Sequence, residues 1–248
     1  MTARSARYAL IAAAASVVLT ACAALPVAPN ELPEEWVPSI SPSPLPSEQA
    51  DSPLGYSLGE RAAVRIRNVT CDGLYTGSGF ILDEHTIVTN HHVVENSGRL
   101  EVTLSDGTDV AVTGSTYATN ADVAIITTPD TLSPSVTLSD TSARRGDSIT
   151  VVGYPDGDVL AVSSGTIEAI ESDTLDNASF VFSTTAEAAP GSSGSAVYDD
   201  EGEVMGVLYA GNEDGAVTFV IPVVLLSAFL NDPTLQVENP AGCTPDWL

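Results

Sequence analysis

At least ten short runs of apolar and β-branched residues, separated by turn signals, fill the chain from about Leu58 to Val223. They are AAVRIRNVTC, GSGFILD, TIVTN, LEVTLSDGTDVAVTGS, DVAIITT, SITVVGYP, VSSGTIEAI, SFVFSTT, GSAVYDDEGEVMGVLYAG and AVTFVIPV. SDGT and DDEG stand where hairpin turns are expected. Only VVLLSAFLN at 223–231 predicts a helix, which Asn-Asp-Pro would close. Short, regularly spaced strands predict an all-β domain of the sandwich or barrel type.

The N-terminus has the features of an export signal. Two arginines precede an uncharged apolar run from Ala9 to Leu19, which is too short to span a bilayer comfortably. The residues Leu-Thr-Ala-Cys that follow resemble the bacterial lipobox, so we expect a lipoprotein signal at 1–21 and a lipid on Cys22. The alternative is an ordinary signal peptide that is cleaved nearby. A lipid at Cys22 would anchor the protein to the outer face of the cell membrane.

The segment 22–57 is predicted to be a linker. It holds eight of the sixteen prolines and has no apolar periodicity, which is typical of an extended spacer. We therefore expect it to lift the folded domain, 58–230, off the membrane. The residues 231–248 are expected to form a C-terminal tail.

The charge balance limits the partners of this chain. Its 33 acidic residues face only eight arginines and no lysine, which gives a net charge of −25. Phosphate contacts need clustered basic side chains, so the composition argues against a nucleic-acid partner and against an anionic membrane surface.

Two cysteines remain beyond the leader. In an exported chain disulfides persist, so Cys71 and Cys243 are predicted to form a bridge that pins the tail to the start of the domain. The chain has no CxxC pair, no HExxH and no histidine cluster with metal-ligand spacing, so neither a metal site nor a cofactor is expected.

The stretch APGSSGSAVYDD contains three serines that could include a nucleophile. Serine catalysis needs a histidine base and a carboxylate behind that base. His85, His91 and His92 are the candidate bases, and only one of the adjacent pair can face a shared site. Asp122 stands at the mouth of a strongly apolar strand and is a candidate acid, or else a turn residue that opens the strand.

The ordered motifs GSGFIL, IVTNHHVV, NADVAIITT, GDSITVVGYP and APGSSGSAVYD resemble those of the trypsin-like serine peptidase family. The resemblance is strongest to its bacterial HtrA-type and glutamyl-endopeptidase-like branches, and it covers about residues 58–230. It implies two six-stranded antiparallel β-barrels, at about 58–135 and 136–230, with the active site in the cleft between them.

The resemblance also assigns roles to residues. The T-N-x-H-V-V segment makes His92 the base, and the D-V-A-I strand start makes Asp122 the acid. The G-x-S-G-S segment makes Ser193 the nucleophile, with the N–H groups of Gly191 and Ser193 as the oxyanion hole.

Specificity residues follow from the same resemblance. Tyr209, Ala210 and Gly211 are expected along the substrate-binding strand. Glu187 would either floor the primary specificity pocket, which would favour a basic side chain, or be a surface acid. The strand VLYAG lacks the histidine of glutamyl endopeptidases, so a glutamate preference is not expected.

Two departures from the family pattern bear on regulation. Ser192 stands where digestive relatives have an aspartate that pairs with a newly freed N-terminus, so activity without such zymogen cleavage is expected. Too few residues follow Leu230 for a PDZ domain.

The sequence thus predicts a lipid-anchored serine endopeptidase that cleaves protein or peptide substrates outside the membrane. The alternative is a catalytically silent domain that binds peptides or partner proteins through the same cleft. A third hypothesis, an acidic spacer or adhesion module, would make the motifs coincidental.

Overall fold

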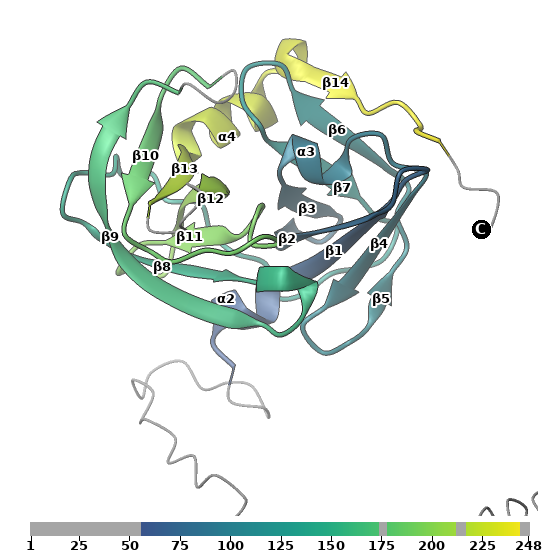
Figure 1. Ribbon diagram of the computed structural model, residues 1–248, viewed down its shortest axis with the longest axis horizontal. Helices are drawn as coiled ribbons and strands as arrows, with labels where there is room; N and C mark the ends of the chain where they lie inside the picture. Colours follow the sequence, from purple (N-terminus) through teal and green to yellow (C-terminus); the bar gives the residue numbers. More distant parts are fainter. Residues whose placement is uncertain (1–55, 174–177, 212–216, 244–248) are drawn as a thin grey trace, which may run out of the picture. The chain divides into compact units, whose positions relative to one another are not determined.

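The computed structural model describes residues 56–173, 178–211 and 217–243, with the side chain of Ala210 excluded. The described part is mostly β and contains two antiparallel sheets with few helices, as the sequence predicts (Figure 1). The first sheet has eight strands in the order β14-β6-β7-β3-β2-β1-β4-β5. They are β1 (Ala63–Val69), β2 (Leu74–Asp83), β3 (Thr86–Thr89), β4 (Arg99–Leu104), β5 (Asp109–Val110), β6 (Gly114–Ala118), β7 (Ala124–Thr127) and β14 (Gln236–Glu238).

The second sheet is a closed barrel of six strands in the order β10-β13-β12-β11-β8-β9. They are β8 (Ser148–Gly153), β9 (Ala161–Glu171), β10 (Val181–Thr184), β11 (Ala196–Tyr198), β12 (Val204–Gly211) and β13 (Thr218–Pro222). The six-stranded barrel predicted for the C-terminal half is therefore present. The first sheet differs from the second six-stranded barrel that was predicted, because it has eight strands, one of which is the tail strand β14 paired with β6.

Strands β8 and β12 of the barrel bury residues on both of their faces. On β8, Val151 belongs to the cluster inside the barrel, whereas Val152 belongs to a larger cluster shared with the first sheet. On β12, Leu208 and Val207 divide in the same way. Successive side chains of a strand point to opposite faces, so a strand covered on both sides needs a continuous apolar run. This explains runs such as SITVVG and VMGVLYAG in the sequence.

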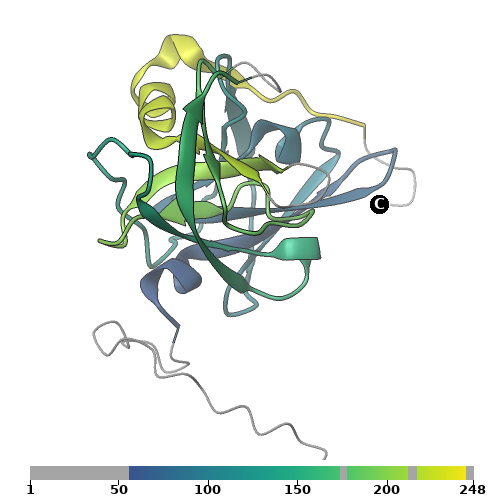
Figure 2. The same cartoon turned by 60° about the vertical axis from the view of Figure 1, so that its left-hand side comes forward.

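The helices are α2 (Leu58–Ala62), α3 (His91–Val94) and α4 (Val223–Asn231), with 3₁₀ turns η2 (Pro155–Gly157) and η3 (Pro233–Leu235). The predicted helix at 223–231 is confirmed, and it lies against β12 and β13 (Figures 1 and 2). Helix α2 was not among the predicted elements, although it begins with a capping box. The Ser57 hydroxyl accepts from Glu60 N at 3.3 Å, and Glu60 Oε2 accepts from Ser57 N at 2.8 Å.

Both predicted hairpin turns are confirmed. In SDGT, Leu104 N donates to Thr108 O at 2.8 Å, so this turn closes the β4–β5 hairpin. In DDEG, Asp199 N donates to Glu203 O at 2.9 Å, between β11 and β12.

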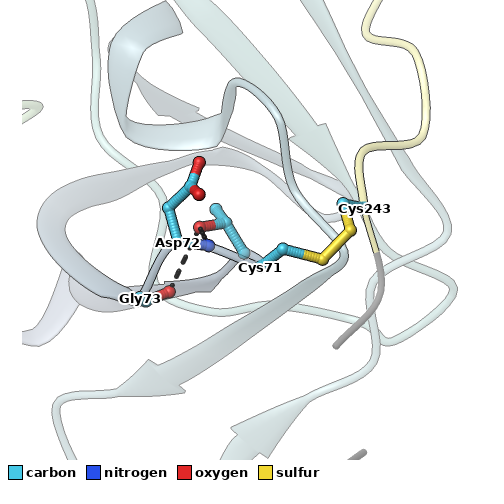
Figure 3. Close-up of a disulfide and its surroundings, with 5 residues drawn as sticks. Cys71, Asp72, Gly73 and Cys243 are labelled. Carbon is cyan, nitrogen blue, oxygen red and sulfur yellow. Dashed lines mark hydrogen bonds between the residues drawn. A yellow bond between two sulfur atoms is a disulfide. The ribbon is translucent and has the colours of Figure 1, made fainter. Parts of the chain in front are cut away.

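The C-terminal tail, residues 231–243, is hydrogen-bonded to the first sheet and to the end of α3. Asn239 N donates to Ser115 O at 2.9 Å, and its side-chain Nδ2 donates to Val94 O, the last residue of α3, at 2.6 Å. Beyond it, Cys243 is joined by a disulfide to Cys71, with 5.5 Å between the two Cα atoms (Figure 3). Cys22, the leader and most of the linker lie outside the described residues.

We expect the Cys71–Cys243 bridge to contribute strongly to stability, since it closes a loop of sequence separation 172. Replacing both cysteines by serine should lower the free energy of unfolding by about 2–5 kcal/mol. Denaturant unfolding with and without a thiol reductant measures the effect. Reductant should destabilise the wild type and leave the double variant unchanged, and a wild type insensitive to reductant would contradict the prediction.

Candidate active site

The imidazole of His92 and the carboxylate of Asp122 are paired. His92 lies on α3 and Asp122 lies between β6 and β7. Asp122 Oδ2 contacts His92 Nδ1, and Asp122 Oδ1 accepts from the backbone N–H of His92 at 2.9 Å. The carboxylate is buried, with 7% of the Asp122 side chain exposed, whereas 44% of the His92 side chain is exposed. The carboxylate thus meets the ring at Nδ1, and the second ring nitrogen is Nε2.

The two residues before His92 have partners of their own. Asn90 precedes α3, and its Nδ2 donates to the backbone oxygen of Asp122 at 2.7 Å. The ring of His91 stacks on Tyr117 of β6, with centroids 3.8 Å apart and planes 7° apart. The two adjacent histidines therefore have different surroundings, because one packs on a tyrosine and the other meets a carboxylate.

Four of the six peptide N–H groups of the serine turn at 189–195 have protein partners. Ser192 donates to Ala189 O at 2.9 Å, Ser195 donates to Ser192 O at 3.0 Å, and Ala189 donates to Ser192 Oγ at 3.3 Å, all within the turn. Gly194 donates to Leu208 O at 2.8 Å. The carbonyls of the turn also have partners outside it. Asp156 N donates to Pro190 O at 2.5 Å, Ser78 Oγ donates to Gly191 O at 2.8 Å, and Ser78 N donates to Ser193 O at 2.7 Å.

Two N–H groups of this turn remain unused. Within the described ranges, neither Gly191 N–H nor Ser193 N–H donates to a protein acceptor. The N–H and C=O of a trans peptide point in opposite directions, so the bond from Asp156 to Pro190 O directs the Gly191 N–H away from Asp156. Two unused donors next to a serine hydroxyl can bind a developing oxyanion.

Gly191 requires the absence of a side chain. Its φ is +90°, in the region that favours glycine. A Cβ atom at this position would lie 2.8 Å from both Asp156 N and Gly157 N. The backbone approach that orients the Gly191 N–H is therefore available only to glycine.

The three serines of the turn differ in exposure. Ser192 and Ser195 are buried, with 6% and 0% of their surface exposed, whereas Ser193 is half-buried. Ser192 Oγ accepts from Ala189 N at 3.3 Å, and Ser193 Oγ donates to Tyr209 O at 3.4 Å. Only Ser193 combines an accessible hydroxyl with the unused N–H groups.

The predicted specificity residues lie in two places. Tyr209, Ala210 and Gly211 end β12, and the Tyr209 hydroxyl donates to Asp173 Oδ1 at 2.7 Å. The side chain of Glu187 is exposed and lines a cavity of about 560 Å³ with residues of β8 and β9 and with Ser192. Tyr209 does not line that cavity.

Other residues of the site are not evident from local sequence rules. Ser78 stands between two glycines in GSGF, which marks a close approach but not a partner. Tyr154 donates its backbone N–H to Ser78 Oγ at 2.8 Å, and burial raises the pKa of its phenol. Asp173 carries no local signal at all, because its partner Tyr209 is 36 positions away.

Two negative findings concern the described ranges only. There, no group of three or more histidine, cysteine or acidic side chains could hold a metal ion. In the same ranges no helix has the length and hydropathy needed to cross a membrane.

Comparison with known proteins agrees with this geometry. A family model described as "Trypsin-like peptidase domain" matches residues 77–207, more than half of the chain. The chain is 29% identical over 192 residues to "Serine protease Rv3671c" of Mycobacterium tuberculosis, covering 73% of this chain and 47% of that protein. It is 32% identical over 181 residues to a "Probable periplasmic serine endoprotease DegP-like" of Halomonas elongata, covering 69% and 37%. The chain thus spans less than half of the length of these relatives.

Solved structures resemble the fold as well. The active form of the Rv3671c protease has a TM-score of 0.66 at 24% identity, over 75% of this chain and 86% of that one. An HtrA-type protease, AlgW, with a tripeptide has a TM-score of 0.62 at 25% identity, over 70% and 62%. On the family match and the fold together, this chain belongs to the trypsin-like peptidase family.

Proposed function

We propose that the chain is a serine endopeptidase that hydrolyses peptide bonds in protein or peptide substrates through an acyl-enzyme intermediate. One observation carries the proposal: the only accessible serine of the turn has beside it the two N–H groups that the turn leaves unused. The pairing of His92 with Asp122 supports it, as do the printed names of the relatives.

In this mechanism Ser193 is the nucleophile. Its hydroxyl leaves the carbonyl of Tyr209, gives its proton to His92 Nε2, and bonds to the carbonyl carbon of the substrate. The N–H groups of Gly191 and Ser193 stabilise the oxyanion that forms, and the Asp122 carboxylate stabilises the imidazolium. His92 then protonates the leaving amine. In the second half of the reaction His92 takes a proton from a water molecule, which attacks the carbonyl carbon of the acyl-enzyme. The bond to Ser193 Oγ then breaks, the hydroxyl regains its proton from His92, and the product acid is released.

Substrate binding is proposed at the open edge of β12. Strand β11 pairs with β12 only as far as Val207, whereas β13 pairs with it through Gly211. Residues 209–211 can therefore accept an extended peptide as an added strand, next to Ser193. Glu187 is left out of this proposal, because its side chain lines the cavity against β8 and β9.

Location and anchoring are a separate part of the proposal. The leader at 1–21, the cysteine at Cys22 and the proline-rich segment 22–57 support a lipid-anchored protein on the outer face of the membrane. The Cys71–Cys243 bridge favours an oxidising compartment, and one relative is named periplasmic.

The triad assignment is tested by labelling the full chain with a fluorophosphonate and mapping the adduct by mass spectrometry. We expect the adduct on Ser193, and we expect Ser193→Ala and His92→Ala to abolish it, with a loss of peptide hydrolysis of roughly 10⁶-fold. Ser195→Ala and His91→Ala are the matched controls and should label as the wild type does. A folded wild type that stays unlabelled would favour the silent binding module.

The oxyanion hole is tested by Gly191→Ala. The added methyl group would collide with backbone atoms of the η2 turn, so the rate of labelling should fall by about 10²–10³-fold. Gly202→Ala is the matched control, because Gly202 also has a positive φ, +79°, but lies in the exposed turn between β11 and β12. Equal losses in the two variants would sink the assignment.

The anchor is tested by Cys22→Ala. The wild type should fractionate with membranes and yield an N-terminal peptide that begins with a diacylglyceryl-modified Cys22, whereas the variant should lose this modification. An N-terminal peptide with an unmodified Cys22 thiol in the wild type would contradict the prediction.

A further inference from the structure

Ser78 is a buried residue of β2 whose polar groups all have partners. Its side-chain Oγ donates to Gly191 O at 2.8 Å and accepts from Tyr154 N at 2.8 Å. Its backbone N–H donates to Ser193 O at 2.7 Å, and its backbone oxygen accepts from Thr89 Oγ1 at 2.7 Å. The residue is 0% exposed. One side chain from the first sheet thus joins the end of β8 to the serine turn.

These bonds restrain the peptides that lie next to those of the proposed oxyanion hole. The carbonyl of Gly191 is held by the Ser78 hydroxyl, and the carbonyl of Ser193 is held by the Ser78 N–H. On the other side, Asp156 holds the carbonyl of Pro190. Gly191 has no Cβ atom to restrict its dihedrals, so these neighbouring bonds must fix its orientation. The Ser78 hydroxyl supplies the restraint on its C-terminal side.

The same strand also touches the base-bearing helix. A Cβ atom on Gly77 would lie 2.5 Å from Cγ1 of Val93, so β2 runs directly against α3. The glycine before Ser78 allows this contact, and Ser78 itself contacts the serine turn. Strand β2 is therefore the element that lies against both halves of the site.

We propose that Ser78 is a positioning residue whose hydroxyl holds the Gly191–Ser192 peptide so that the N–H groups of Gly191 and Ser193 converge on one point. The inference rests on the proposed peptidase function and deepens it. A hydroxyl suits this position because it donates one hydrogen bond and accepts another at the same time, which alanine or any other apolar side chain cannot do. Without it, the buried Gly191 carbonyl and Tyr154 N–H would both lose their partners.

The test compares Ser78→Ala and Ser78→Thr with the wild type, in the full chain. Threonine keeps the hydroxyl, and Ser183→Ala is the matched control, since Ser183 is a buried strand serine bonded to Glu171. Fluorophosphonate inactivation is resolved into the concentration constant KI and the maximal rate kinact. Hydrogen exchange of a peptide covering 189–195 is measured on the same samples.

We expect kinact of Ser78→Ala to fall by about 10–100-fold with KI unchanged, as misorientation of a catalytic group does. Exchange in 189–195 should accelerate in that variant, while Ser78→Thr and Ser183→Ala stay near the wild type in both readouts. A Ser78→Ala protein with wild-type kinact and wild-type exchange would overturn the inference. A wild type that is not labelled would instead refute the proposed function, and exchange in 189–195 alone would then decide on Ser78.

Discussion

The contact between β2 and the serine turn is the constraint on which the rest of the site depends. His92 and Asp122 lie on segments between strands of the first sheet, and Ser193 lies shortly before β11 of the barrel, so the two sheets must keep a fixed position relative to one another. Hydrogen bonds from Ser78 to Gly191, Ser193 and Tyr154 hold that position, and Ser78 is fully buried. A hydrogen bond is stronger in such surroundings, and a missing one is more costly. Tyr154, one of these partners, belongs to the large apolar cluster shared by the two sheets.

The serine turn illustrates how function can be read from unsatisfied groups. Buried peptide groups are nearly always paired, and those of 189–195 largely follow that rule. The two N–H groups without a protein partner are therefore the informative ones. One of them belongs to Ser193, the only half-buried serine of the turn, and the other belongs to Gly191, two residues before it. The proposed chemistry rests on this exception rather than on the abundance of serine in the segment.

Ion pairs contribute little to this arrangement. The chain has 33 acidic residues and eight arginines, and the pairs found in the described ranges are Arg67–Glu101, Arg99–Glu101 and His92–Asp122. The arginine pairs are exposed, where such pairs stabilise a protein by no more than about 1 kcal/mol. Apolar burial, hydrogen bonds and the tail disulfide must therefore hold the fold, while the acidic surface serves solubility. Asp122 is the exception, because it is buried and its carboxylate meets the side chain of His92, the proposed base.

The sequence by itself determined the all-β class, the two hairpin turns and α4, because these depend on alternation, on turn residues and on the Asn-Asp-Pro that ends α4, all of which short segments carry. It also singled out His92, Asp122 and Ser193 as candidates, since the order of the motifs along the chain can be read without knowing how the chain packs. Only the tertiary structure decided that β14 joins the first sheet, that Glu187 lies on the cavity against β8 and β9, and that Ser78 and Asp173 belong near the site. These features depend on contacts between distant residues, up to 145 positions apart for the hydrogen bond from Asn239 to Val94, and no local pattern encodes the partner of a distant hydrogen bond.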